Sequence, residues 1–132
     1  MTKIISMATR ASIRIVDGDK RIDLYHHWDG YPEGVGVDLV KYCGKIDERM
    51  RWRIDNIAND LVKGKIVNIE AGQEVPDMGY EISYGFHADI EYAYLIDCVR
   101  KKVFCHEIGW EEEYSSLNEI FAKAKVVEIP SK

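Results

Sequence analysis

Long apolar runs, paired cysteines and an excess of basic charge are all missing from this chain of 132 residues. A membrane-spanning helix needs about 20 mainly apolar residues, and the longest uninterrupted apolar run, at 92–96, is far shorter. The formal net charge is -5, whereas proteins that coat nucleic acid need a basic surface to neutralise phosphates. We therefore expect neither a membrane partner nor binding to a long nucleic-acid duplex.

Cysteine is scarce, since Cys43, Cys98 and Cys105 are the only three and form no Cys-x-x-Cys pair. An odd number with this spacing is typical of a reduced protein with buried thiols, not of a disulfide scaffold or a zinc finger. Residues 1–7 also lack the apolar core and cleavage signal of a secretory leader. These features predict a cytoplasmic protein.

The composition is that of an ordinary globular protein, with 46% apolar and 31% charged residues. This size predicts a single domain over residues 1–132 with a buried core. Residues 11–16 and 21–28 alternate between apolar and polar positions around a turn at 17–20, which is typical of a β-hairpin. The same alternation predicts strands at 80–86, 90–98 and 102–108, and residues 66–69 and 126–129 suit short extended segments.

Helical periodicity occurs in three segments. One helix begins near Val37 and has Gly44 as its candidate end. A second spans 48–62, with Asp47 as N-cap and Gly64 as terminator, and a third spans 117–125. Because strands fall in hairpins and no glycine-rich phosphate loop follows a strand, the order favours an α+β fold. We expect a mainly antiparallel sheet of about five strands in hairpins, with the helices packed on one face.

The chemically richest stretch is 25–36, which contains two of the four histidines, two acidic residues and three glycines. His27 and Asp29 share a face if the strand continues, and with Glu33 they form a candidate acid–base or metal-binding set. Two ligands are too few for a catalytic zinc site, and no other residue has a matching spacing. We therefore predict no metal, and we interpret His27 more simply as hydrogen-bonded to the backbone of the loop.

The loop at 29–36 also has features of a ligand-binding loop. It leads into a helix N-terminus, whose free N–H groups attract anions. Aromatic rings flank it that can stack on a planar group, and arginines on the neighbouring strand are placed to complete a phosphate or carboxylate clamp. The alternative is that Arg10 pairs with Asp29 or Glu33 and that the loop simply turns the chain. The candidate ligand-binding residues are Arg10, Arg14, His27, Trp28, Asp29, Tyr31 and Glu33.

The segment Met7-Ala8-Thr9-Arg10 and the pattern Tyr25-x-His27-x-Asp29-Gly30-Tyr31-Pro32-Glu33-Gly34-x-Gly36 resemble a family of small uncharacterised proteins. This family is common in bacteriophages, prophages and some bacteria, and the resemblance covers residues 7–43. It implies a phage-related, cytoplasmic setting and a usual start near Met7, so that residues 1–6 are an extension, which we expect to be flexible. It implies no catalytic residue.

Two functions fit these features. The first is a phage- or prophage-encoded counter-defence protein that sequesters a small nucleotide-like ligand or blocks a host protein. We expect it to need no cofactor and to form a homo-oligomer, because small folds often build pockets between subunits. The second is a small metal-dependent phosphodiester hydrolase or nuclease that uses His27, Asp29 and Glu33. Because the catalytic set is incomplete, we favour the binding protein over the enzyme.

Overall fold

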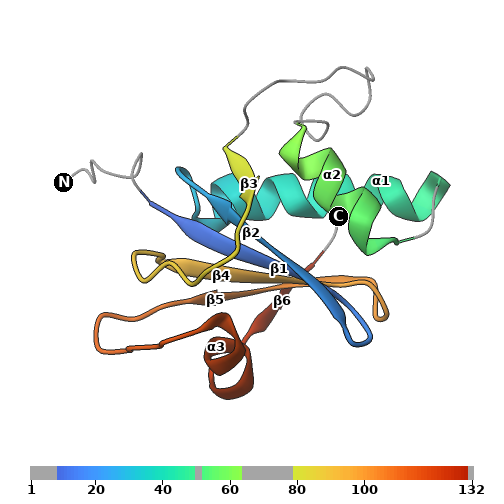
Figure 1. Cartoon of the computed structure of the whole chain (residues 1–132). Coiled ribbons are helices and arrows are strands. Elements are labelled where there is room, and N and C mark those ends of the chain that lie inside the picture. The colour runs from blue at the N-terminus through green and yellow to red at the C-terminus, as the bar shows by residue number, and fades with distance from the viewer. Residues whose placement is uncertain (1–8, 50–51, 64–78, 131–132) are drawn as a thin grey trace.

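The computed structural model describes residues 9–49, 52–63 and 79–130. They form a six-stranded sheet in the order β3-β2-β1-β4-β5-β6, with helices α1 and α2 on one face and helix α3 on the other (Figure 1). The expected α+β fold with a mainly antiparallel sheet is confirmed. No helix within the described ranges is long and apolar enough to cross a membrane.

The first hairpin has the geometry that the alternating residues predict. Strands β1 (Ala11–Asp17) and β2 (Lys20–His26) pair antiparallel, from Ala11↔His26 to Asp17↔Lys20. Gly18 in the turn has φ 65°, which glycine adopts at little steric cost. Strand β2 ends two residues earlier than expected because the chain leaves the sheet before Asp29, whose φ of 51° does not fit an extended strand.

The second expected hairpin consists of β4 (Tyr92–Asp97) and β5 (Lys102–Glu107), and β6 (Val127–Ile129) pairs with β5. Strand β3 (Tyr80–Ile82) is shorter than the predicted strand at 80–86 and lies at the sheet edge beside β2. Strands β1 and β4 pair in parallel, which the hairpin pattern did not predict. The strand expected at 66–69 lies outside the described residues.

A π-helical turn, η2 (Pro32–Gly36), leads into α1 (Val37–Arg49), and α2 (Ile54–Val62) follows. The predictions that Gly44 ends the first helix and that Asp47 caps the second are wrong, because both residues lie inside α1. An isolated glycine costs a helix only about 1 kcal/mol, and the buried side chains of Tyr42 and Cys43 hold this part of α1 against the core. Helix α3 (Leu117–Lys123) follows the prediction closely.

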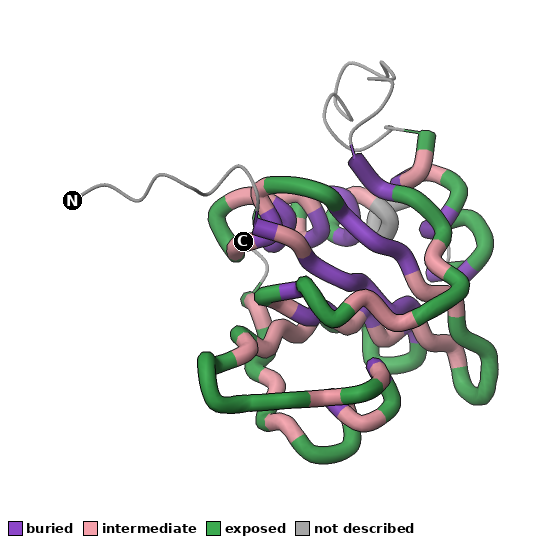
Figure 2. Tube along the Cα trace, turned by 60° about the vertical axis from the view of Figure 1, so that its left-hand side comes forward, coloured by how far each residue is buried: buried purple, intermediate pink, exposed green. Residues whose placement is uncertain are grey.

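Each face of the sheet has its own core. The larger core joins the sheet to α1 and α2, and the smaller one joins it to α3. The central strands are buried and the loops around α3 are exposed in Figure 2. The larger core includes Ile13, Ile15, Leu24, Tyr94, Ile96, Leu39, Ile57 and Leu61, and the smaller one includes Tyr25, Ala93, Ile90, Leu117 and Ile120. The expectation that the helices pack on one face is therefore wrong for α3, which covers Tyr25 and Ala93 on the face opposite α1 and α2.

Alternation along β1 decides which face each of its side chains reaches. Ile13 and Ile15 belong to the core beneath α1 and α2. Ser12 and Arg14 lie between them in sequence, and successive side chains of a strand point to opposite faces. Arg14 therefore projects toward α3, where it hydrogen-bonds to Asn118.

Candidate functional site

The loop after β2 is a compact turn held to the sheet by its backbone. The Gly30 N–H donates to the carbonyl of Thr9 over 3.0 Å, and the Gly30 carbonyl accepts from the Tyr94 hydroxyl over 2.5 Å. Within the turn, the Tyr31 hydroxyl donates to Asp29 Oδ1 over 2.9 Å. Two of the candidate ligand-binding side chains, Asp29 and Tyr31, are thus bonded to each other.

The start of the helical segment is already occupied by backbone acceptors. The Gly34 N–H donates to the Tyr31 carbonyl over 2.9 Å, and the Val35 N–H donates to the Asp29 carbonyl over 3.0 Å. A Cβ atom on Gly34 would lie 2.4 Å from the Asp29 carbonyl oxygen, so only glycine fits there. The expected anion site at this N-terminus would have to compete with these hydrogen bonds, which weakens that hypothesis.

Trp28 and Glu33 lie at the outside of the same turn. The indole of Trp28 is 38% exposed, and its ring centroid is 5.4 Å from that of the buried His26. Gly79 passes so close that a Cβ on it would meet both rings at about 3 Å. Glu33 is exposed. The aromatic face of Trp28 is therefore partly covered by its own neighbours.

His27 and Arg10 belong to a different cluster, on the α3 face of the sheet. His27 Nε2 lies 3.2 Å from Glu81 Oε2, and Arg10 Nε lies 3.4 Å from Asp89 Oδ2. Both pairs are substantially exposed, so each contributes at most about 1 kcal/mol to stability. The adjacent residues His26 and His27 point to opposite faces, as neighbours in a strand do, since His26 is buried and His27 is exposed.

Tyr25 is the centre of this second cluster. Its hydroxyl donates to the Asp89 carboxylate, with distances of 2.9 and 3.1 Å to the two oxygens. The ring stacks on His87 with centroids 3.8 Å apart and meets His27 edge-on at 4.8 Å. Burial first, and then the hydrogen bond and charge of Asp89, raise the pKa of Tyr25 to about 12. Tyr25 is therefore a neutral hydrogen-bond donor at physiological pH.

Two of the three residues of the hydrolase hypothesis are engaged by different partners. His27 pairs with Glu81, and the Asp29 carboxylate accepts from Tyr31. Among the described residues, no three His, Cys, Asp or Glu side chains are grouped so that they could hold a metal ion. Within these residues the metal-dependent form of the hypothesis therefore has no group of three ligands to support it.

Arg14 is the candidate residue that the fold engages most strongly. It is only 8% exposed, and its guanidinium group forms two hydrogen bonds with the carboxylate of Asp23, Nε to Oδ1 over 2.8 Å and Nη2 to Oδ2 over 3.0 Å. Its Nη1 donates to Asn118 Oδ1 over 2.6 Å, and its Cζ lies 5.8 Å from the centroid of the Phe121 ring. Arg14 thus connects the first hairpin to α3 and does not form a clamp with the loop at 29–36.

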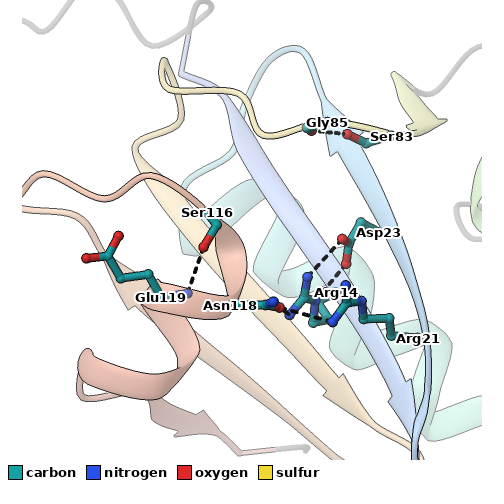
Figure 3. Close-up of polar contacts among 8 residues, drawn as sticks. All are labelled: Arg14, Arg21, Asp23, Ser83, Gly85, Ser116, Asn118 and Glu119. Atoms are coloured by element: carbon teal, nitrogen blue, oxygen red, sulfur yellow. Dashed lines mark hydrogen bonds and ion pairs between the residues drawn. The ribbon is translucent and has the colours of Figure 1, made fainter.

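Arg21 reaches the same amide from the edge of the hairpin. Its Nη1 donates to Asn118 Oδ1 over 3.1 Å, so one oxygen accepts from two guanidinium groups. Figure 3 shows Arg14 and Arg21 projecting from β1 and β2 toward Asn118 at the start of α3. Ser116 Oγ caps this helix by accepting from the Glu119 N–H over 3.0 Å, which fixes the turn that carries Asn118.

These side chains line an open pocket of about 170 Å³. Arg14, Arg21 and Asp23 form one wall, residues 83–86 after β3 form another, and residues 116–118 complete it. The aromatic residues Tyr84, which is 95% exposed, and Phe86 lie in the second wall. Two guanidinium groups and one carboxylate leave a net positive charge at this pocket in an acidic protein.

Comparison of this chain with known proteins identified no relative. No family model, curated protein or solved structure matches the chain. Inference about function therefore depends on the side chains of the pocket, and the resemblance of residues 7–43 stays a prediction.

Of the pocket residues, the sequence singled out only Arg14. The pairing of Arg14 with Asp23 follows from the predicted hairpin, because a turn at 17–20 sets these residues opposite each other. Arg21 could have been found on the same argument, since it lies on the face of β2 that Asp23 defines. Asn118 and Tyr84 had no local signal, because they reach the pocket from segments far away in the chain.

Proposed function

We propose that this chain is a small binding protein that holds a nucleotide-like anion in the pocket between the first hairpin and α3. One observation carries the proposal: two guanidinium groups, of Arg14 and Arg21, converge on a pocket that has a single carboxylate, Asp23, among its described residues. Guanidinium groups bind phosphate and carboxylate through charge-assisted hydrogen bonds. Tyr84 and Phe86 add aromatic faces on which a planar ring can stack.

The size of the pocket limits what it can enclose. Pockets that bury a drug-sized ligand usually measure about 300–1,000 Å³, whereas this one measures about 170 Å³ and is open to solvent. It suits one part of a mononucleotide, with the rest exposed. A ligand of this kind gains its affinity from the charged contacts and from stacking more than from burial.

The hydroxyl groups of the pocket support binding over hydrolysis. Ser83 Oγ donates its proton to the Gly85 carbonyl over 2.8 Å, so in its 3.1 Å contact with His87 Nε2 the hydroxyl accepts. With its proton donated to the Gly85 carbonyl, the Ser83 hydroxyl has none to donate to His87, so the pair is not arranged as a nucleophile and its base. Ser116 Oγ is the cap of α3. Both hydroxyls thus serve the backbone.

The proposed biological setting is a phage or prophage protein that acts in the cytoplasm, sequesters its ligand as a counter-defence factor, and forms a homo-oligomer. The resemblance of residues 7–43 supports the phage setting, and the small single domain supports an oligomer. Native mass spectrometry of the purified protein tests the oligomer and any ligand that the protein retains. A monomer would contradict the proposed homo-oligomer, and the lack of any added mass would contradict the sequestered ligand.

The pocket itself is tested by calorimetric titration with adenosine 5′-monophosphate, and with adenosine as the uncharged control. We expect the monophosphate to bind and adenosine to bind at least tenfold more weakly, because the charged contacts supply most of the affinity. Arg21→Gln should weaken binding about tenfold, the effect of one lost charged hydrogen bond. Arg53→Gln is the matched control, since Arg53 is exposed at the start of α2 on the other face of the sheet. Equal effects of the two variants would refute the proposal.

A second candidate function, docking to a host protein, is favoured by Trp110. This side chain is 97% exposed, although tryptophan is among the residues that most often dominate protein interfaces. The turn that presents it is ordered by Glu112, whose carboxylate accepts from the Gly109 N–H over 2.6 Å and from the Tyr114 hydroxyl over 3.1 Å. Exposed glutamates at 107, 111 and 113 lie within three residues of it in the sequence, so a basic partner surface with an apolar recess is the best match.

Selection from a random-peptide display library, with the protein as bait, tests this second function. We expect the selected peptides to combine lysine or arginine with an apolar anchor. They should lose about tenfold in affinity for Trp110→Ala and keep their affinity for Tyr84→Ala, which removes the other highly exposed aromatic side chain. Peptides without a basic bias, or peptides insensitive to Trp110→Ala, would remove this candidate.

A further inference from the structure

Asn118 occupies an unusual position between two cations. Its amide oxygen accepts from Nη1 of Arg14 over 2.6 Å and from Nη1 of Arg21 over 3.1 Å. An amide oxygen has two lone pairs, so both are engaged by guanidinium groups. This is the arrangement in which an oxygen of phosphate or carboxylate normally binds arginine, but here the acceptor carries no charge.

The two arginines differ in how their charges are matched. Arg14 is neutralised by the two-hydrogen-bond pair with Asp23. Among the described residues, the only hydrogen bond or ion pair of the Arg21 side chain is the one to Asn118. Arg21 thus brings a charge that Asn118 solvates but does not balance, and an anion at this point would balance it.

We propose that Asn118 is a removable stand-in for the ligand, and that a phosphate or carboxylate oxygen displaces its amide oxygen from between Arg14 and Arg21. This inference rests on the proposed anion pocket and adds the way in which that pocket opens. Asn118 is exposed and lies in the first turn of α3, whereas Leu117 and Ile120 anchor the helix in the core. A rotation of the Asn118 side chain into solvent therefore frees Nη1 of Arg14 and Nη1 of Arg21 without unfolding α3.

Two substitutions of Asn118 should act in opposite directions on affinity. Asn118→Ala removes the competing acceptor, so inorganic phosphate and adenosine 5′-monophosphate should both bind about tenfold more tightly than they bind the native protein. Asn118→Asp places a carboxylate between the arginines, so both ligands should bind at least tenfold more weakly. Both variants suit the fold, because alanine favours helices and an acidic residue is favourable in a first turn.

Thermal unfolding provides an independent readout on the same proteins. Asn118→Asp should have a higher unfolding midpoint than the native protein, and Asn118→Ala should have a lower one. The variant that binds the anions more tightly should therefore be the less stable of the two. A residue that merely contacts the ligand would not produce this inverse relation. Asn56→Ala is the matched control, since Asn56 is an exposed asparagine of α2 on the opposite face.

The titrations separate the fate of this inference from that of the proposed function. If the native protein binds both anions and Asn118→Ala binds them more weakly, Asn118 is a direct ligand contact and the stand-in role is refuted while the pocket survives. If neither the native protein nor Asn118→Ala binds inorganic phosphate or the monophosphate, both proposals fail. If Asn118→Ala binds inorganic phosphate more tightly than the native protein does, but not the monophosphate, the stand-in role is supported and the preference for a nucleotide is refuted.

Discussion

Arg14 and Asp23 face each other across the first hairpin and are joined by two parallel hydrogen bonds of 2.8 and 3.0 Å. The Arg14 side chain is nearly buried, and that of Asp23 is largely so. This pair sets the orientation of the guanidinium group whose remaining nitrogen reaches Asn118. It therefore links the stability of the sheet to the geometry of the pocket.

Replacement of Arg14 should be costly because it leaves the partly buried Asp23 carboxylate without its partner. We expect Arg14→Met to lower the free energy of unfolding by about 2–4 kcal/mol, and Arg14→Lys by about 1–2 kcal/mol because lysine cannot form the two-pronged pair. Urea denaturation measures both. Arg100→Met is the control, since the Arg100 side chain is 65% exposed and Asp97, its partner, also accepts from the backbone N–H groups of Val99 and Arg100, so the change in stability should be less than about 1 kcal/mol. Equal losses for Arg14→Met and Arg100→Met would contradict the structural role of Arg14.

Two glycines of the same helical segment should respond to alanine with opposite signs. A Cβ at Gly34 collides with the Asp29 carbonyl oxygen, so Gly34→Ala should destabilise the protein by about 2 kcal/mol or more. A Cβ at Gly44 meets nothing within 4 Å inside α1, so Gly44→Ala should stabilise it by about 0.5–1 kcal/mol. Chemical denaturation of both variants tests the tight turn at Asp29, and a neutral Gly34→Ala would show that the turn relaxes.

The burial of Tyr25, together with its hydrogen bond to Asp89, should make stability fall at high pH. Because the pKa of Tyr25 is raised from 10.0 in the unfolded chain to about 12 in the folded one, its contribution is complete below pH 10 and is lost as the pH rises through 12. Tyr25→Phe should therefore lose this pH dependence. NMR titration of the labelled tyrosine ring carbons locates the pKa directly, and Asp89→Asn should lower it while burial keeps it above 10. An unshifted Tyr25 resonance would refute the contact.

The cap of α3 should be worth a measurable amount of stability. Ser116→Ala removes the acceptor for the Glu119 N–H and should cost about 1 kcal/mol in unfolding experiments. Ser115→Ala serves as the comparison, because the Ser115 hydroxyl only supplements the bond that its own backbone N–H already makes to Glu119. A larger loss at Ser115 than at Ser116 would mean that the helix begins elsewhere.

Sequence periodicity predicted which helices and strands form more accurately than it predicted the residues at which they begin and end. Alternation and the turn at 17–20 were sufficient for the β1–β2 hairpin and its register, because both depend on neighbouring residues alone. The predicted helix boundaries were wrong where packing outweighed intrinsic helix propensity. Helix α1 continues through Gly44, because Leu39, Tyr42 and Cys43 pack in the core. The parallel pairing of β1 with β4 had no local signal, since residues 18–91 separate the two strands.

The candidate residues illustrate the same limit at the level of the site. The sequence grouped seven residues around one loop, but β1 sends Arg14 to the face opposite η2 and α1. Arg10 and His27 lie in a cluster with Asp89 and Glu81. Proximity along the chain was therefore a poor guide, because adjacent side chains of a strand lie on opposite faces of the sheet.

The sequence by itself determined the class of the fold, the first hairpin and, through its register, the opposition of Arg14 and Asp23. Each of these follows from periodicity and turn chemistry within a few residues. Only the tertiary structure decided that α3 folds over the outer face and brings Asn118 to Arg14 from 104 positions away. The physical reason is that this contact depends on burying Leu117 and Ile120 against Tyr25 and Ala93, a match of surfaces that exists only once the sheet has formed.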